Sequence, residues 1–304
     1  MSYTYHAYGL TIRVPFACPA LTPPAIGSVV AAVDVDVQER PVPRRMRARW
    51  AGEASWDAAP GLFLLRGGPR AGRFLVEAGN VTFERNAGCN DAALARCFTD
   101  QVLAALLRHR GLLVLHANAV AAPDGVIVIG GESGVGKSTT LAALLERGCR
   151  MLSDDVTALR RGGASGSVEV VPGAAQTHLT EHAAENLGYP VDPAQLQPWR
   201  RMKAAIPTHD GMASRPGRLA ALYVLRVSRG DDVAVAQASG GDKFHALQEC
   251  MYGPMFSEEH PALFPLMSTV VAAVPFFRLE RPAGRWSVGE VADAILGSVP
   301  ELVS

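Results

Sequence analysis

Short stretches of alternating hydrophobic and polar residues occupy the first ninety or so positions and predict strands. The stretches TYHAYGLTIRV, SVVAAVDVDVQ, GLFLLRGG and RFLVEAGNVTFER are rich in β-branched and aromatic residues, and Gly and Pro clusters separate them. Such a pattern is typical of strands joined by turns. The run VDVDV alternates strictly, as a half-buried strand does. Because no group of ligands or nucleophiles occurs there, we interpret residues 1–90 as a β-rich N-terminal module for packing or peptide docking.

The pattern changes to helical spacing after residue 90. Apolar residues recur every three or four positions, at Leu94, Phe98, Val102, Leu106 and Leu107. Asn90-Asp91 provides a cap and Gly111 follows the repeat, so the spacing predicts a helix from about Ala92 to Arg110.

Strands and helices alternate from residue 111 onward. Strands are expected at LLVLHANAV, VIVI, a short stretch ending at Asp154-Asp155, VTALRR, SVEVV and AALYVLRV. A glycine-rich turn between VTALRR and SVEVV predicts a hairpin. Helices are expected at TTLAALLER, THLTEHAAENLG, DKFHALQECMYG and RWSVGEVADAILGSV. This alternation predicts an α/β fold with a mixed sheet, and we assign residues 91–304 to one domain.

The charge balance excludes some classes of partner. The 304 residues include 29 basic and 29 acidic side chains, so the formal net charge is zero. Such a chain lacks the basic character of nucleic-acid-binding proteins, and we expect no nucleic-acid partner. The arginines of PVPRRMRARW, residues 41–50, are interpreted as a solvated surface, although they also suit an acidic peptide.

The cysteines and the hydropathy pattern predict the compartment. The five cysteines, at positions 18, 89, 97, 149 and 250, form no CxxC pair and are expected to be reduced. No apolar run of about eighteen residues is present to span a membrane. The first residues, MSYTYHAYGLTIRV, lack the features of a signal peptide. These observations predict a cytoplasmic protein without a membrane partner.

The segment GESGVGKS, Gly131–Ser138, has the spacing of a phosphate-binding loop. An apolar strand precedes it and a helix follows, which is the context that such a loop requires. Backbone N–H groups and the helix N-terminus would hold nucleotide phosphates. Lys137 would neutralise the outer phosphates, and the Ser138 hydroxyl would bind Mg²⁺. The predicted nucleotide-binding residues are Gly131, Glu132, Ser133, Gly134, Val135, Gly136, Lys137, Ser138 and Thr139.

Paired carboxylates follow the loop helix. Asp154 and Asp155 end a predicted strand, the position of the magnesium-side aspartate in phosphate-loop enzymes. One carboxylate suffices for the metal, whereas a second is what a kinase needs to deprotonate an incoming hydroxyl. The alternative is a polar strand end that faces water. His116 lies on a strand expected beside the loop strand, and spacing alone does not distinguish a site residue from a core histidine.

The order of these features resembles the catalytic domain of the HPr kinase/phosphorylase family. That family has a histidine on the strand before the loop, a loop of the form G-[DE]-S-G-x-G-K-S and a segment K/R-R-G-H-R-L-x-x-D-D. Here RGCRMLSDD matches the last segment, with Cys149 in place of the histidine. The similarity covers about residues 112–160. It implies a phosphate-loop kinase core with a mixed sheet, like the C-terminal domain of that family.

The resemblance also implies roles for individual residues. Asp154 would be the general base, and Asp155 would join Ser138 in holding Mg²⁺. His116 would orient one carboxylate or contact the transferred phosphate. Lys137 would stabilise the outer phosphates during transfer. The implied cofactors are ATP, or another nucleoside triphosphate, and Mg²⁺. Arg215 and Arg218 are candidates for an arginine that assists the transfer, because they lie in a segment that faintly resembles a basic loop of the family.

The chain departs from the family in two informative places. His116 is followed by Ala117 where the family has glycine, and the family's phosphorolysis signature is absent from VVPGAAQTHLTEH. We therefore expect a kinase without phosphorylase activity. The segment YHAYGLTIRVPFACPALTP resembles the opening of related kinases from ribosomal peptide pathways, including lasso-peptide tailoring kinases. Such enzymes phosphorylate a serine of a precursor peptide, often near its C-terminus.

Three functions remain open at this point. The leading hypothesis is an ATP-dependent serine kinase that acts on a peptide or protein, and the alternatives are a small-molecule hydroxyl kinase and a non-enzymatic nucleotide-binding regulator. The paired aspartates disfavour the regulator, because a switch needs no base. The sequence leaves open the acceptor, the preferred nucleotide base and whether the chain forms a homo-oligomer.

Overall fold

The computed structural model describes residues 1–25, 27, 32–46, 50–51, 55–68, 70–163, 166–190, 203–253 and 260–298. The chain divides into two compact units. Unit 1 comprises Met1–Val114 and Tyr252–Pro265, and unit 2 comprises Leu115–Met251 and Leu266–Ser304. The sequence predicted a division near residue 90, whereas the units divide after Val114, and a later segment returns to unit 1.

The helix after residue 90 accounts for this difference. It comprises α1 (Asp91–Cys97), the π-helical turn η1 (Phe98–Val102) and α2 (Leu103–His109), with the Asn90 side chain accepting a hydrogen bond from the Ala93 N–H. The predicted helix and its cap are therefore confirmed. The Phe98 ring packs edge-on against Phe16, with centroids 6.0 Å apart. The helix belongs to unit 1 because its apolar face completes the core of that unit.

Unit 1 is built on two sheets, in the orders β1-β2-β3 and β4-β9-β8-β7-β6-β5. Its strands are β1 (Tyr3–Ala7), β2 (Leu10–Val14), β3 (Val35–Asp36), β4 (Gln38–Glu39), β5 (Trp50–Ala51), β6 (Trp56–Ala59), β7 (Leu62–Arg66), β8 (Gly72–Glu77) and β9 (Asn80–Arg85). The rings of Phe16, Phe74 and Phe83 pack together in the core. The β-rich prediction for this region is confirmed.

The alternation of VDVDV is also visible in the structure. Val35 and Val37 are buried, whereas Asp36 is exposed, although the strand is divided into the short β3 and β4. Residues 28–31 of the same predicted strand lie outside the described residues. The predicted basic surface falls partly outside them too, at residues 47–49, and Arg44 and Arg45 are exposed.

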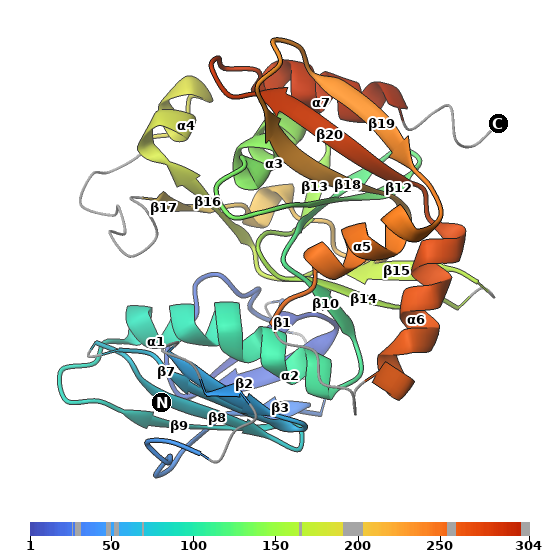
Figure 1. Ribbon diagram of the computed structural model, residues 1–304. Helices are drawn as coiled ribbons and strands as arrows, with labels where there is room; N and C mark the ends of the chain where they lie inside the picture. Colours follow the sequence, from blue (N-terminus) through green and yellow to red (C-terminus); the bar gives the residue numbers. More distant parts are fainter. Residues whose placement is uncertain are drawn as a thin grey trace. The chain divides into compact units, whose positions relative to one another are not determined.

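Unit 2 contains a mixed sheet, as predicted (Figure 1). Neighbouring strands follow the order β10-β14-β15-β18-β12-β11-β13, and β20 pairs with both β18 and β19. The strands are β10 (Leu113–Leu115), which contains the boundary between the units, β11 (Asn118–Ala122), β12 (Gly125–Gly130), β13 (Arg150–Ser153), β14 (Thr157–Arg161), β15 (Val168–Val171), β18 (Gly217–Ser228), β19 (Ala234–Ala238) and β20 (Phe276–Pro282). A separate pair is formed by β16 (Gln176–Thr180) and β17 (Lys203–Pro207).

Unit 2 also contains helical segments. They are α3 (Lys137–Glu146), α4 (Glu181–Asn186), the 3₁₀ turn η4 (His209–Gly211), α5 (Gly241–Glu249) and α7 (Val288–Ser298), while α6 (His260–Ala273) crosses the boundary between the units. Leu141 and Leu144 of α3 and Ile295 of α7 share one core with Ile127 and Ile129 of β12. Burial of these side chains fixes α3, and hence the phosphate loop before it, on the sheet.

The structure corrects part of the predicted element order. The segment THLTEHAAENLG was expected to be one helix, but its first residues form β16 and only Glu181–Asn186 is helical. Thr180 explains the change, because its hydroxyl caps α4. The predicted strand LLVLHANAV is interrupted at His116-Ala117. Strands β17, β19 and β20 and helix α6 were not expected, and residues 191–202 lie outside the described residues.

The expectations for the cysteines and for membrane spans concern the described residues only. All five cysteines are free thiols, as expected, and four of them are buried. Within the described ranges, no helix combines the length and the hydrophobicity needed to cross a membrane.

Candidate active site

Strand direction gathers the sequence-predicted site residues of unit 2 at one edge of the sheet. β12 runs parallel to β18, and β18 runs parallel to β20. β11 is antiparallel to both β12 and β13, so β13 runs in the same direction as β12. The carboxyl ends of these strands therefore meet at one edge, which is where open α/β sheets bind ligands. The phosphate loop follows β12, the aspartate pair follows β13, and His116 precedes β11 at this edge.

Glycines give the phosphate loop its shape. Gly131, Gly134 and Gly136 have φ values of 131°, 91° and 108°, a backbone region that L side chains rarely adopt. A Cβ atom at Gly131 would collide with the Leu225 carbonyl oxygen. Gly136 is the N-cap of α3 and offers no side chain to the first N–H groups of the helix. Those N–H groups can therefore donate to an anion.

The other loop residues have distinct environments. Glu132, Ser133 and Gly134 are exposed, Val135 is buried in the core of unit 2, and Thr139 is half-buried in the first turn of α3. The Val135 side chain anchors the loop to the sheet. The loop thus presents its backbone, rather than its side chains, as a surface for phosphates.

Lys137 folds back over the loop. Its Nζ donates to the carbonyl oxygens of Gly131, at 2.8 Å, and Glu132, at 3.1 Å. Burial lowers the pKa of Lys137, and the charges of Asp155 and Asp154 act in the opposite direction. The ammonium group therefore lies within the field of both carboxylates.

Asp154 is buried and tied to the loop. Its carboxylate accepts hydrogen bonds from the hydroxyl groups of Ser138, at 3.2 Å, and Thr177, at 2.7 Å, and from the His178 N–H, at 3.0 Å. Only 6% of the residue is exposed. Burial, followed by the charge of Asp155, raises the pKa of Asp154 to about 6. The surrounding donors hold this carboxylate against the loop serine.

Asp155 has a different environment. Its φ of 65° is left-handed, and its N–H donates to Asn118 Oδ1 at 3.4 Å. The carboxylate is partly exposed, and its Oδ2 lies 4.0 Å from His178 Nδ1. The left-handed backbone turns this side chain away from the path of β13, so the two carboxylates do not share one environment.

His116 contacts the main chain of Asp155. The ring Nδ1 lies 3.3 Å from the Asp155 carbonyl oxygen, and the backbone N–H of His116 donates to the Cys250 carbonyl oxygen at 2.6 Å. Burial and the nearby Lys137 lower the pKa of His116, which favours the neutral ring. A neutral imidazole with a proton on Nδ1 would donate to this carbonyl oxygen and fix the backbone of Asp155.

Several residues near the pair were not predicted. Thr177 and the His178 N–H come from β16, where the sequence predicted a helix. The charge of Lys203, on β17, acts on Asp154, Lys137 and His116. Arg281, on β20, donates from Nε to the Val135 carbonyl oxygen at 2.7 Å. No motif marks these residues, and only the strand pairing brings them to the loop.

The candidate arginines Arg215 and Arg218 lie elsewhere. Arg218 is at the start of β18 and donates to the Asp124 carbonyl oxygen, just before β12 begins. Arg215 precedes β18 at the same end. The six residues of β12, at about 3.3 Å each, separate that end from the phosphate loop. Neither arginine therefore reaches the loop of its own chain.

The residues present fit a magnesium ion. The Ser138 hydroxyl and the Asp154 carboxylate are hard oxygen donors in contact with each other beside the loop. Mg²⁺ in nucleotide sites takes one or two carboxylates and completes its shell with phosphates and waters. Among the described residues, no three His, Cys, Asp or Glu side chains gather in a metal-binding cluster. The donor set therefore suits a nucleotide-bound cation better than an all-protein cage. Asp154 contacts Ser138, whereas the sequence assigned Asp155 to the metal.

Comparisons with family models and curated proteins assign the chain to no family. No protein-family model matches it, and no curated protein matches it. Among solved structures, it is similar to the Hpr(Ser) kinase/phosphatase from Coxiella burnetii, with 12% identity and a TM-score of 0.34. That alignment covers 62% of this chain and 94% of the other.

Proposed function

We propose that the chain is an ATP-dependent kinase that transfers the γ-phosphoryl group to a serine hydroxyl of a peptide or protein. The supporting observation is the contact between Ser138 and Asp154, with a second carboxylate, Asp155, next to it in a different environment. A nucleotide switch needs only the first carboxylate, whereas transfer to an alcohol also needs a proton acceptor.

The donor side of the reaction consists of the loop, Lys137, Ser138 and Asp154. The loop N–H groups and the start of α3 hold the nucleotide phosphates, and Lys137 turns from the loop carbonyl oxygens toward the outer phosphates. Ser138 and Asp154 would hold Mg²⁺, and this ion would supply positive charge that neutralises the nucleotide phosphates.

The acceptor side is formed by Asp155. The serine oxygen attacks the γ-phosphorus, the bond from that phosphorus to the β–γ bridging oxygen breaks, and ADP leaves. The serine proton moves to the Asp155 carboxylate. Asn118 and His116 hold the main chain of Asp155, so they act as positioning residues. This division of roles reverses the expectation from the sequence. Thr177 and the His178 N–H both donate to Oδ2 of Asp154, whereas its Oδ1 lies beside the Ser138 hydroxyl, at 3.2 Å.

The acceptor that we propose is a serine near the C-terminus of a ribosomal precursor peptide of the lasso type. The support is the sequence resemblance of the N-terminal segment to peptide-tailoring kinases. A small-molecule hydroxyl would not require an additional β-rich module such as unit 1.

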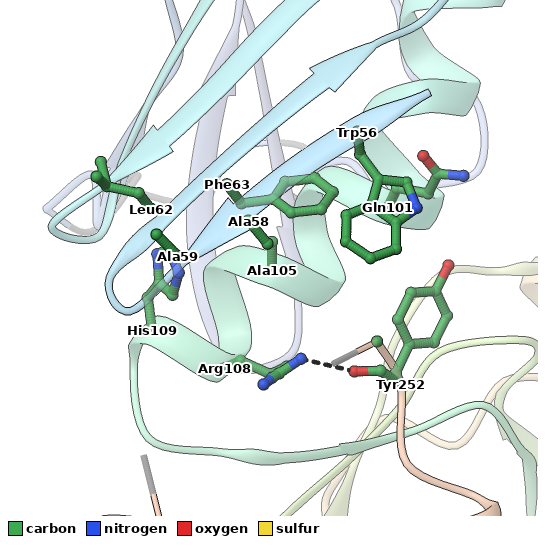
Figure 2. Close-up of a pocket in the computed structure, with 11 residues that line it drawn as sticks. Trp56, Ala58, Ala59, Leu62, Phe63, Gln101, Ala105, Arg108, His109 and Tyr252 are labelled. Atoms are coloured by element: carbon green, nitrogen blue, oxygen red, sulfur yellow. Dashed lines mark hydrogen bonds between the residues drawn. The ribbon is translucent and has the colours of Figure 1, made fainter. Parts of the chain in front are cut away.

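Unit 1 offers a cavity for part of such a peptide. The cavity, of about 230 Å³, is lined by aromatic and small apolar side chains together with Gln101, Arg108 and His109. Figure 2 shows the Trp56 and Phe63 rings on one wall, and their centroids are 6.0 Å apart. Gln101 Oε1 is buried there without a hydrogen-bond partner among the described residues. A peptide N–H would satisfy this oxygen, and an apolar side chain would fill the space beside the rings.

Substitutions at the two aspartates test the proposed function. Asp155→Asn tolerates the left-handed backbone and removes the proton acceptor, so phosphoryl transfer to a serine peptide should fall by about 10²-fold or more. Nucleotide and Mg²⁺ binding should remain. Asp154→Asn should instead raise the Mg²⁺ concentration required for turnover, and thermal melting would show whether each variant is folded.

The outcomes separate the two assignments. Normal transfer by Asp155→Asn, with an inactive Asp154→Asn that still binds nucleotide, would restore the assignment of Asp154 as the base. Normal transfer by both folded variants would show that the site is not a kinase centre of this type.

A further inference from the structure

A cavity of about 380 Å³ opens beside the phosphate loop in unit 2. Gly136, Thr139 and Thr140 of the loop and α3 form one wall, and the segment from Arg281 to Val288 forms another, with His182 of α4 completing the lining. Its volume falls within the range of about 300–1,000 Å³ that is usual for small-molecule sites. Neither Asp154 nor Asp155 lines it, so the cavity lies on the donor side of the loop.

The guanidinium group of Arg281 points to an anion at the mouth of this cavity. A Cβ atom at Gly136 would lie 3.4 Å from Arg281 Nε and 3.8 Å from Nη2. Arg281 therefore covers the N-terminus of α3, which is the positive end of the helix. Nε and Nη1 donate to the carbonyl oxygens of Val135 and Pro282, whereas no hydrogen bond of Nη2 is found among the described residues. The guanidinium group and the helix N-terminus repel each other, and a phosphate bound between them would turn this repulsion into attraction to the anion.

An aromatic wall continues the cavity away from the loop. Trp286 lines the cavity, and 42% of the residue is exposed. The His182 ring contacts it edge-on, with centroids 5.4 Å apart and planes at 84°. This contact fixes the orientation of the indole and leaves its surface available for a flat aromatic group.

A buried hydroxyl group provides an independent indication of a ligand. Ser287 is 4% exposed, lines the cavity, and its Oγ has no hydrogen-bond partner among the described residues. A buried hydroxyl without a partner is costly, and a polar ligand atom removes this cost.

The segment that carries Trp286 and Ser287 is held in place from both sides. Arg285 forms an ion pair with Glu290 of α7 and donates to the Asp231 carbonyl oxygen. A preformed wall of this kind loses little conformational entropy when a ligand binds.

We propose that this cavity binds the nucleoside of the nucleoside triphosphate, an inference that rests on the proposed function. The base stacks on Trp286, a ribose or base polar atom bonds to Ser287, and the phosphates pass Arg281 into the loop. Arg281 thus takes the place of the basic residue that the sequence analysis sought at Arg215 or Arg218. The chemical class recognised is an aromatic base joined to a polyphosphate.

Binding of Mg²⁺ complexes of ATP and inorganic tripolyphosphate to the full chain tests this proposal. Trp286→Ala should weaken ATP binding by about tenfold or more and leave tripolyphosphate binding unchanged, because stacking concerns the base alone. Trp286→Phe should retain most of the ATP affinity. Phe264→Ala, which removes an exposed aromatic side chain outside this cavity, is the matched control and should bind ATP as the wild type does. Arg281→Gln should weaken both ligands.

The possible outcomes are distinguishable. If Trp286→Ala binds ATP with wild-type affinity, or loses both ligands equally while still folded, the nucleoside does not occupy this cavity. If the wild type binds ATP no more tightly than tripolyphosphate, the nucleoside adds no affinity and this inference fails. The assignment of the phosphate loop as the polyphosphate site would then still hold. If the wild type binds neither ligand, both this inference and the proposed kinase function fail.

Discussion

Cationic side chains reach the phosphate loop from separate parts of the chain. Lys137 comes from α3, Lys203 from β17 and Arg281 from β20. Lys137 is anchored to the loop carbonyl oxygens, Arg281 covers the helix N-terminus, and the charge of Lys203 acts on Asp154. During transfer, charge develops on the outer phosphate oxygens, so the cation nearest to those oxygens should matter most.

Lys137→Ala tests whether Lys137 is the cation that contributes most to transfer. We expect turnover with a serine peptide to fall by about 10²-fold or more and nucleotide affinity to fall less, because the charge stabilises the transition state more than the bound nucleotide. Steady-state kinetics and direct nucleotide binding measure the two effects. Lys243→Ala is a matched control, since this lysine lies over the Phe276 ring, 5.4 Å from its centroid, away from the loop. Wild-type turnover in Lys137→Ala would remove the phosphate loop from the mechanism.

At the scale of elements, the sequence predicted what depends on neighbouring residues. The strand, glycine loop and helix around Gly131–Ser138 form a local motif, and the cap at Asn90 and the hairpin β14-β15 are local as well. Each was confirmed because its residues interact within a few positions of one another.

The elements that were missed depend on distant pairing. β16 was expected to be helical, yet it pairs with β17, and Thr177 reaches Asp154 across 23 positions. Arg281 contacts Val135 across 146 positions. No periodic pattern encodes such contacts, because the parallel pairing of β18 with β20 places Arg281 at the loop. The different environments of the two aspartates were equally inaccessible, since the left-handed backbone of Asp155 breaks the alternation assumed for a strand end.

The packing of the loop against β18 gives a prediction at this scale. Gly131→Ala places a methyl group against the Leu225 carbonyl oxygen at a φ of 131°. The free energy of unfolding should therefore fall by about 1–3 kcal/mol. Nucleotide binding should fall as the loop shifts. Gly211→Ala, with open space around its Cβ, should melt like the wild type. Equal melting temperatures for both variants would contradict the close approach of the loop to β18.

At the scale of the whole molecule, the proposed tasks are divided between the units. Unit 2 contains the phosphate loop, both aspartates and the cavity beside α3. Unit 1 contains an aromatic cavity but none of the predicted catalytic residues. If unit 1 binds part of a peptide acceptor, changes there should alter acceptor recognition and leave the nucleotide steps intact.

Trp56→Ala is the most direct test of this division. Removing the indole from the cavity of unit 1 should raise the KM for a full-length precursor peptide by about tenfold or more, because large aromatic side chains dominate recognition surfaces. The kcat and the KM for ATP should stay unchanged, since the phosphate loop and the aspartates belong to unit 2. Trp56→Phe keeps a ring beside Phe63, so its KM for this peptide should lie between those of the wild type and Trp56→Ala.

A short serine peptide that lacks the remainder of the precursor should be phosphorylated equally by the wild type and both Trp56 variants. Equal KM values for the full-length peptide in Trp56→Ala and the wild type would exclude this cavity as a peptide site, and a loss of activity toward the short peptide would assign Trp56 to stability rather than to recognition.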